Sequence, residues 1–153
     1  MEEKLVSILR ENGMFLTTVE SCTGGMLASK IVGVSGASDV FREGFITYAN
    51  SAKETYAGVS RTTLEKYGAV SSQVAMEMAQ GAAKKTGSNV VISVTGIAGP
   101  DGGTPEKPVG LVYVGCYVNG KVRVEEFRFT GNRSKNRDYA VVRALTLLRE
   151  ELI

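Results

Sequence analysis

The segment from Glu20 to Gly25, Glu-Ser-Cys-Thr-Gly-Gly, holds the side chains best suited to chemistry in this chain. It lies where an apolar stretch over Phe15–Val19 gives way to a helical pattern that begins near Thr23. A strand-to-helix turn of hydroxyls and glycines exposes backbone N–H groups beside the positive end of a helix, and such a turn can hold an anion. The same turn offers Ser21 as a candidate nucleophile. Because the chain has no histidine, any base that activates Ser21 must be another kind of residue.

A second group of candidates follows the next predicted strand, Phe45–Ala49. Tyr48 and Asn50 share one face of that pattern, although sheet packing and a turn would also explain them. Lys53 comes a few residues later and can reach the same strand end. It can act as a base near neutral pH only if burial or a nearby positive charge lowers its pKa by about 3. Cys22 is a rival nucleophile, whose thiolate would depend on the helix end or on Lys53.

A second glycine-rich loop runs from Thr95 to Gly103 and follows the apolar, β-branched run Val90–Thr95. That run predicts a strand buried on both faces at the centre of a sheet. If this strand and the first run parallel, their loops meet at one sheet edge, where open α/β proteins bind ligands. Neither loop carries a Walker A or dinucleotide fingerprint. A plain connecting role and phosphate binding therefore explain the glycines equally well.

Three basic residues cluster where the last helix is expected to begin: Arg133, Lys135 and Arg137. The helix dipole disfavours cations at this end, so these side chains are either simply solvated or meet an anionic ligand. Asp101 has no acidic partner that would complete a metal site, so we expect no metal. The two cysteines, Cys22 and Cys116, lack the spacing of a zinc or redox motif, and we expect reduced thiols.

Strand and helix patterns alternate along the chain and predict the frame that positions these residues. The Asn119-Gly120 pair between two alternating stretches predicts an antiparallel hairpin. The second arm, Lys121–Phe129, exposes charges on alternate residues, as an edge strand does. Helical patterns precede the first strand, separate the next ones and close the chain. The sequence therefore predicts an α/β fold, a three-layer α/β/α sandwich around a mixed, largely parallel sheet with one antiparallel hairpin.

Composition predicts one globular domain over residues 1–153. The chain is 43% hydrophobic and 22% charged, enough for one core but too short for two full domains. Its formal net charge of +2 is too balanced for a duplex nucleic-acid surface and favours a small-molecule partner. No apolar run approaches the roughly 20 residues that cross a bilayer, and the first segment lacks a signal-peptide pattern. We therefore expect a cytoplasmic protein that does not bind a membrane.

Several ordered motifs together resemble the CinA C-terminal domain family of competence-damage-inducible proteins. The resemblance spans nearly the whole chain and rests on Glu20–Gly25, Gly44–Tyr48 with Asn50 and Lys53, Tyr67–Ser71, Thr95–Gly103 and Lys107–Gly110. It implies hydrolysis of the carboxamide of nicotinamide mononucleotide to nicotinate mononucleotide and ammonia, in pyridine nucleotide recycling. It implies no cofactor. Family members with a larger N-terminal domain have activities that cannot be assigned to this chain.

The resemblance also implies roles for particular residues. Ser21 is similar to the catalytic hydroxyl of the family, Lys53 to its activating base and Tyr48 to a supporting polar group. The resemblance implies substrate contacts by Thr95 and Arg137, with Arg133 as the alternative to Arg137 one helical turn away. Together with the loop and strand-end residues, the expected substrate contacts are Thr23, Gly24, Gly25, Asn50, Thr95, Gly96 and Arg137. We expect Lys53 to deprotonate Ser21 while backbone donors of a glycine loop stabilise the oxyanion. Attack by water that Ser21 orients is the alternative route.

Two other functions stay open from the sequence alone. The glycine loops would also suit a nucleotide-binding module without turnover. A competence-linked nucleic-acid accessory protein is the weakest reading, because the sequence lacks interleaved aromatic and basic residues. The sequence does not decide whether the chain forms a homo-oligomer.

Overall fold

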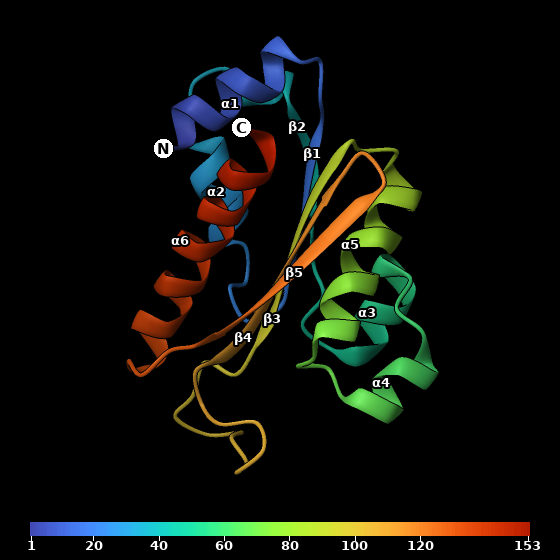
Figure 1. Ribbon diagram of the computed structural model, residues 1–153, viewed down its shortest axis with the longest axis vertical. Coiled ribbons are helices and arrows are strands. Elements are labelled where there is room, and N and C mark those ends of the chain that lie inside the picture. The colour runs from blue at the N-terminus through green and yellow to red at the C-terminus, as the bar shows by residue number, and fades with distance from the viewer.

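Five strands form one mixed sheet in the order β2-β1-β3-β4-β5 in the computed structural model, which describes residues 1–153 (Figure 1). The strands are β1 (Leu16–Glu20), β2 (Phe41–Ile46), β3 (Val90–Gly96), β4 (Leu111–Val118) and β5 (Lys121–Arg128). β1 pairs in parallel with both β2 and β3, and β4 pairs antiparallel with β3 and β5. The predicted central strand, hairpin and edge strand are thereby confirmed. The sheet is mixed as predicted, but it has two parallel and two antiparallel pairings and is not largely parallel, because β4 returns antiparallel beside β3.

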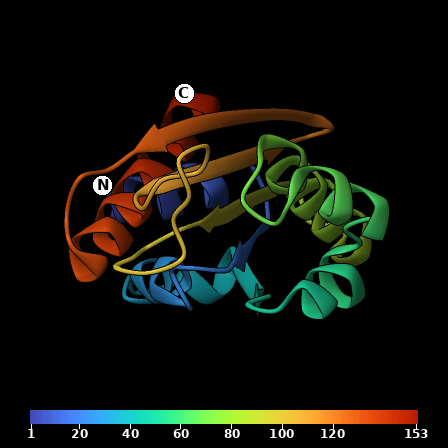
Figure 2. The same ribbon diagram turned by 90° about the horizontal axis from the view of Figure 1, so that it is seen from below.

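Helices cover both faces of the sheet, which confirms the predicted three-layer sandwich (Figures 1 and 2). One face carries α1 (Glu2–Glu11), α2 (Met26–Val32) and α6 (Arg133–Leu152), and the other carries α3 (Asn50–Ala57), α4 (Arg61–Tyr67) and α5 (Ser72–Thr86). A short 3₁₀ helix, η1 (Ala37–Asp39), precedes β2. None of the helices has the length and apolarity that a membrane span requires.

The α5 helix lies close to its neighbours because the side chains on one of its faces are small. Ala75, Ala79 and Ala82 of this face are completely buried. On the same helix, a Cβ atom added to Gly81 would come within 1.7 Å of the Ala57 carbonyl oxygen at the end of α3. Only glycine permits this approach, and the approach fixes α3 against α5. The position of α3 matters because this helix carries Lys53.

The predicted boundaries of the second strand were wrong. β2 ends at Ile46, where its pairing with Glu20 of β1 ends. The Thr47 amide still donates to the Glu20 carbonyl at 2.8 Å, and the chain then turns into α3. Tyr48 therefore lies in a connection and Asn50 begins a helix, so the two do not share a strand face. Alternation alone could not show this, because the partner strand decides where pairing stops.

The first helix boundary also differs from the expectation. The helical pattern was predicted to begin near Thr23, whereas α2 begins at Met26. Turns occupy the intervening residues, and Gly24 and Gly25 adopt φ angles of 56° and 101° there. Left-handed backbone of this kind is readily available only to glycine. The two glycines therefore shape the turn that follows β1.

Candidate active site

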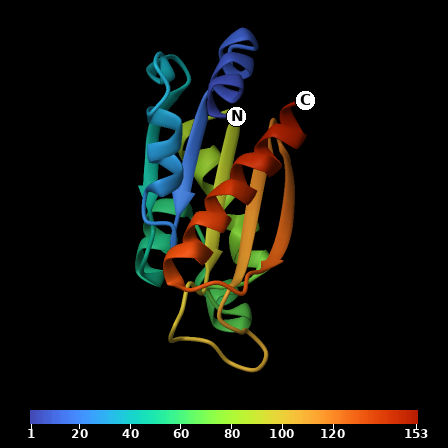
Figure 3. The same cartoon turned by 90° about the vertical axis from the view of Figure 1, so that its left-hand side faces the viewer.

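A cavity of about 200 Å³ opens at the sheet edge where the parallel strands β1 and β3 end. Its lining residues are Ser21, Cys22, Tyr48, Asn50, Lys53, Ala69, Val70, Thr95, Gly96, Ala98 and Arg133. Six of them were predicted from the sequence as site residues. The loop between β3 and β4 extends past the same edge (Figure 3). The expectation that both glycine loops meet at one sheet edge is therefore confirmed.

Ser21 and Lys53 are in direct contact in this cavity. The Lys53 Nζ atom lies 3.2 Å from Ser21 Oγ, and it donates to the carbonyl oxygens of Thr47 at 2.8 Å and Tyr48 at 3.3 Å. A neutral amine has two N–H bonds and one lone pair. When the two carbonyls take the N–H groups, the lone pair faces the serine hydroxyl. This arrangement lets the amine accept a proton from Ser21.

Lys53 is buried without an opposite charge. Its side chain is 1% exposed, and it takes part in no ion pair. Burial lowers the pKa of the Lys53 ammonium from its ordinary value, and the nearby Cys22 opposes this effect to a smaller extent. Loss of hydration penalises the charged form of an amine. The fold thus provides the burial that a lysine base requires near neutral pH.

Cys22, the rival nucleophile, is poorly suited to that role. Its thiol is 6% exposed, and burial raises its pKa to about 11. Its own backbone and the charge of Arg137 lower that pKa only in part. Because a thiol attacks as the thiolate, Cys22 is almost entirely in its unreactive form near neutral pH. The geometry therefore favours Ser21.

The turn after β1 is held by a buried carboxylate that sequence reasoning missed. Glu20, 1% exposed, accepts hydrogen bonds from Thr23 Oγ1 at 2.6 Å and from the amides of Leu27 at 2.9 Å and Ala28 at 3.1 Å. The N-terminal amides of α2 are therefore already occupied by an anion of the chain itself. The periodicity hid this role, because Glu20 belongs to the strand and contacts the helix seven and eight residues later.

The residues of that turn are thus placed differently from the predicted substrate contacts. The Thr23 hydroxyl is fully buried and donates to Glu20. Neither Thr23 nor Gly24 nor Gly25 lines the cavity. The structure therefore does not support an anion site at the start of α2. The three residues instead form the turn that presents Ser21.

The two candidate arginines have separate roles. Arg137 donates to the carbonyl oxygens of Cys22 at 2.9 Å and Thr23 at 3.3 Å, and so fastens α6 to the turn. Arg133 lines the cavity, where it donates to the Gly99 carbonyl at 2.9 Å and to Tyr48 Oη at 3.3 Å. The sequence could not choose between them, because residues four apart lie on the same helix face.

The far wall of the cavity comes from β3 and from the connection between α4 and α5. Thr95 Oγ1 donates to the Ala69 carbonyl at 2.8 Å and holds that connection against the strand end. Gly96 is a glycine for packing reasons, since an added Cβ would lie 2.6 Å from Val112 Cγ2 in β4. Ala69 and Val70 were not predicted as site residues, although they lie within the Tyr67–Ser71 motif.

Comparison with known proteins identifies the family. The family model described as the CinA C-terminal domain matches residues 1–152. This chain belongs to the CinA C-terminal domain family. It is 54% identical over its full length to a CinA-like protein of Kosmotoga olearia and 56% identical to a competence-damage inducible protein of Clostridium novyi. In both cases the chain spans 37% of the length of the curated relative.

Solved structures of CinA proteins have the same fold. The competence/damage inducible protein CihA from Agrobacterium tumefaciens superposes with a TM-score of 0.91 at 41% identity, over 97% of this chain and 94% of that one. A CinA superfamily protein from Enterobacter cloacae superposes with a TM-score of 0.95 at 34% identity, over 99% of this chain and 90% of that one. The predicted family and fold class are therefore confirmed.

The segments that resemble the CinA family converge on the cavity although they lie far apart in the chain. Glu20–Gly25 presents Ser21, and α3 presents Lys53. The Tyr67–Ser71 segment supplies one wall, and Lys107 of the Lys107–Gly110 segment donates to the Tyr67 carbonyl. That bond fastens the loop between β3 and β4 to the end of α4. The motifs are thus parts of one site.

Proposed function

We propose that this chain hydrolyses the carboxamide of nicotinamide mononucleotide to nicotinate mononucleotide and ammonia, with Ser21 as nucleophile and Lys53 as base. The observation that carries the proposal is the 3.2 Å contact between Ser21 Oγ and the amine of Lys53, which is buried and has no ion-pair partner. A hydroxyl beside an amine of lowered pKa suits attack on a carbonyl carbon. The choice of nicotinamide mononucleotide as substrate rests on the family resemblance and on the capacity of Arg133 to bind an anion.

The first half of the reaction forms an acyl-enzyme. Neutral Lys53 takes the proton of Ser21, and Oγ attacks the carboxamide carbon. The N–H group of Cys22, a residue that lines the cavity, has no backbone acceptor, and we assign it to the developing oxyanion. The Ser21 amide is not available, because it donates to the Val94 carbonyl at 2.9 Å. Protonated Lys53 then gives its proton to the amide nitrogen, and ammonia leaves.

The second half returns the enzyme to its starting state. Lys53, neutral again, accepts a proton from water, whose oxygen attacks the acyl carbon. Lys53 then returns that proton to Ser21 Oγ as the acid departs. Each proton that Lys53 accepts is returned within the cycle, so the amine acts in turn as base and acid. Direct attack by water that Ser21 orients remains the alternative, and an acyl-enzyme trapped by acid quench and mass spectrometry would separate the two routes.

Substrate contacts follow from the walls of the cavity. Ala69, Val70 and Ala98 provide an apolar lining for the pyridine ring, and Asn50 and Thr95 provide polar groups beside it. Tyr48 lies at the rim with its side chain 64% exposed. The Arg137 guanidinium and the residues Thr23, Gly24 and Gly25 contribute by shaping the turn that carries Ser21.

Ammonia release tests the proposal directly. Purified protein is incubated with nicotinamide mononucleotide, free nicotinamide or the intact dinucleotide, and ammonia is measured by a coupled assay. We expect ammonia from the mononucleotide in the wild type and none above background in Ser21→Ala. Binding of the mononucleotide without ammonia from any of the three compounds would instead identify a nucleotide-binding module without turnover.

A further inference from the structure

The Ser21–Lys53 cavity is small for a complete nucleotide. Its volume of about 200 Å³ is below the roughly 300–1,000 Å³ typical of small-molecule sites. It can take a ring and its carboxamide, which are the reacting part of the proposed substrate. The sugar and phosphate then need further space that adjoins this cavity. This need for space rests on the proposed function, because it follows from the size of the proposed substrate.

A second cavity supplies such space. Its volume is about 470 Å³, and its lining residues are Ala98, Pro100, Val109, Gly131, Asn132, Arg133 and Ser134. It lies between the loop after β3 and the start of α6, and it shares Ala98 and Arg133 with the first cavity. The two hollows are therefore neighbours, and the Arg133 side chain belongs to both of them.

The contacts of Arg133 place its guanidinium between the two hollows. One nitrogen donates to the Gly99 carbonyl at 2.9 Å and another to Tyr48 Oη at 3.3 Å. The second bond is longer than the usual range for an N–H donor and is made to a neutral phenol, so it is weak. Arg133 takes part in no ion pair. A full positive charge therefore stands between the cavities without an anionic partner.

The surroundings of Arg133 increase the local positive potential. Arg133 is the first residue of α6, a helix of 20 residues with no acidic residue in its first turn. The helix dipole places partial positive charge at this end, and Lys135 adds a further cation in the same turn. An incoming anion is therefore favoured at Arg133 over the Tyr48 hydroxyl.

We propose that the two cavities are halves of one substrate site and that Arg133 is its specificity-determining residue. The phosphate of the substrate binds the guanidinium, which releases Tyr48, and the joined cavities then hold the whole mononucleotide. A substrate without phosphate leaves the Arg133–Tyr48 bond in place and gains nothing from the second cavity. The site thus selects phosphorylated amides over unphosphorylated ones.

The test compares ligands with and without the phosphate in matched variants. Kinetics use nicotinamide mononucleotide and nicotinamide riboside, and titration calorimetry uses the acid products, nicotinate mononucleotide and nicotinate riboside. In Arg133→Ala we expect KM and Kd for the phosphorylated ligands to rise about 10- to 100-fold, as for loss of one charge-assisted pair. The kcat for nicotinamide mononucleotide should change less than about 3-fold, because loss of an interaction that binds the substrate and the transition state equally raises KM and leaves kcat nearly unchanged.

Two further variants separate this role from general effects of charge and folding. Lys135→Ala removes one positive charge from the same helical turn, but Lys135 lines neither cavity. We therefore expect its loss to weaken binding of the phosphorylated ligands less than about 3-fold, the scale of an exposed charge, and to leave the other two ligands unaffected. Arg133→Lys keeps a charge without the planar fork and should restore part of the affinity for the phosphorylated ligands. Equal losses in Arg133→Ala and Lys135→Ala, or equal losses for ligands with and without phosphate, would overturn the inference.

The same assays distinguish a wrong role for Arg133 from a wrong enzymatic activity. If the wild type releases ammonia from nicotinamide mononucleotide and Arg133→Ala shows an unchanged KM, the Arg133 role is wrong and the amidohydrolase activity stands. If no protein releases ammonia but Arg133→Ala loses affinity for nicotinate mononucleotide alone, the two-part site stands and the activity is wrong.

Discussion

The Nζ atom of Lys53 lies 3.2 Å from the Oγ atom of Ser21, although 32 residues separate them in the chain. Two elements create this contact. Ser21 follows β1, and Lys53 lies in the first turns of α3, the helix that follows β2. Because β1 and β2 are parallel neighbours, their carboxyl ends lie side by side. The order of the strands in the sheet therefore brings Ser21 and Lys53 together, and the proposed chemistry depends on this contact.

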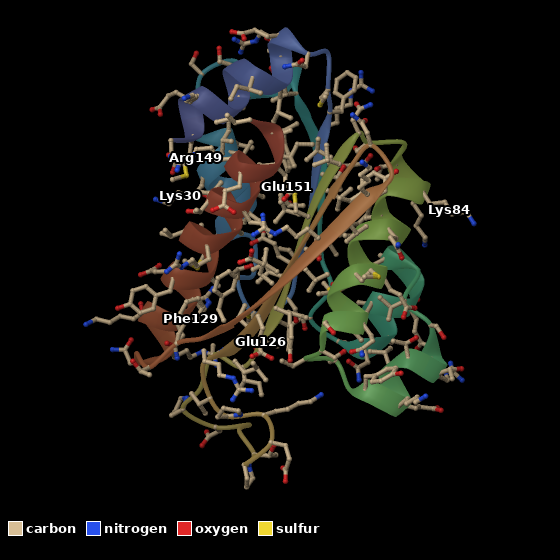
Figure 4. All side chains as sticks on the ribbon, in the orientation of Figure 1. Lys30, Lys84, Glu126, Phe129, Arg149 and Glu151 are labelled. Carbon is tan, nitrogen blue, oxygen red and sulfur yellow. The ribbon has the colours of Figure 1, made fainter.

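Removal of either member of the pair should abolish most of the activity. We expect Ser21→Ala and Lys53→Met each to lower kcat about 10²- to 10⁴-fold, the usual contribution of a positioned base or nucleophile. Ser29→Ala and Lys84→Met serve as controls, because both side chains are exposed and Lys84 projects into solvent (Figure 4). Steady-state ammonia release measures the effect. Activity within a few-fold of the wild type in either site variant would remove that residue from the mechanism.

The rate should rise with pH as Lys53 loses its proton. Burial lowers the pKa of Lys53 from the ordinary 10.5, so the rising limb of kcat/KM against pH should have its midpoint below that value. Lys53→Arg should be inactive across the whole range, because a guanidinium does not deprotonate in proteins. A rate that falls through the same range would show that the ammonium form of Lys53 is the active one.

Stability should also depend on the charge of Lys53. Its folded pKa is below the unfolded value of 10.5, so the unfolded chain binds more protons between the two values, and the free energy of unfolding rises with pH there. Below the folded pKa the wild type carries the full cost of the buried ammonium. We expect the stability of Lys53→Met relative to the wild type to be greatest at low pH and to decline toward pH 10.5. Urea titrations at a series of pH values measure this, and a pH-independent difference would contradict it.

The Glu20 carboxylate should be a main stabiliser of the turn that carries Ser21. Glu20→Gln keeps the size of the side chain but replaces one acceptor with a donor that faces the α2 amides. We expect a loss of about 1.5–3 kcal/mol, typical of hydrogen bonds to a charged group. Glu43→Gln in the exposed part of β2 is the matched control. Equal midpoints of urea unfolding for the two variants would show that the carboxylate contacts contribute little.

Both cysteines should resist alkylation in the folded protein. Burial raises the pKa of Cys22 to about 11 and that of Cys116 to about 12. Only about 0.1% of the Cys22 thiol is then ionised at pH 8, and the thiolate is the reactive form. We expect iodoacetamide to label neither residue appreciably in native buffer and both in urea, by mass spectrometry. Rapid native labelling of Cys22 would restore it as a candidate nucleophile.

Much of the frame follows from local patterns. The β-branched run at Val90–Thr95 predicted the central strand, and the Asn119-Gly120 pair predicted the hairpin. Both signals depend only on residues that are neighbours in the sequence. The end of β2 was not predictable in this way. Its last pairing depends on Glu20 in another strand, so the assignment of Tyr48 and Asn50 required the sheet.

By itself, the sequence determined which side chains could do chemistry and that they follow strands, since the type and order of residues are enough for that. It left open which polar groups are already hydrogen-bonded to other parts of the chain. Only the tertiary structure decided that Glu20 occupies the α2 amides, that Arg137 holds the turn and that Arg133 faces the cavity. A side chain is free for a ligand only when no distant part of the chain has taken its hydrogen bonds, and such contacts form only when the layers pack together.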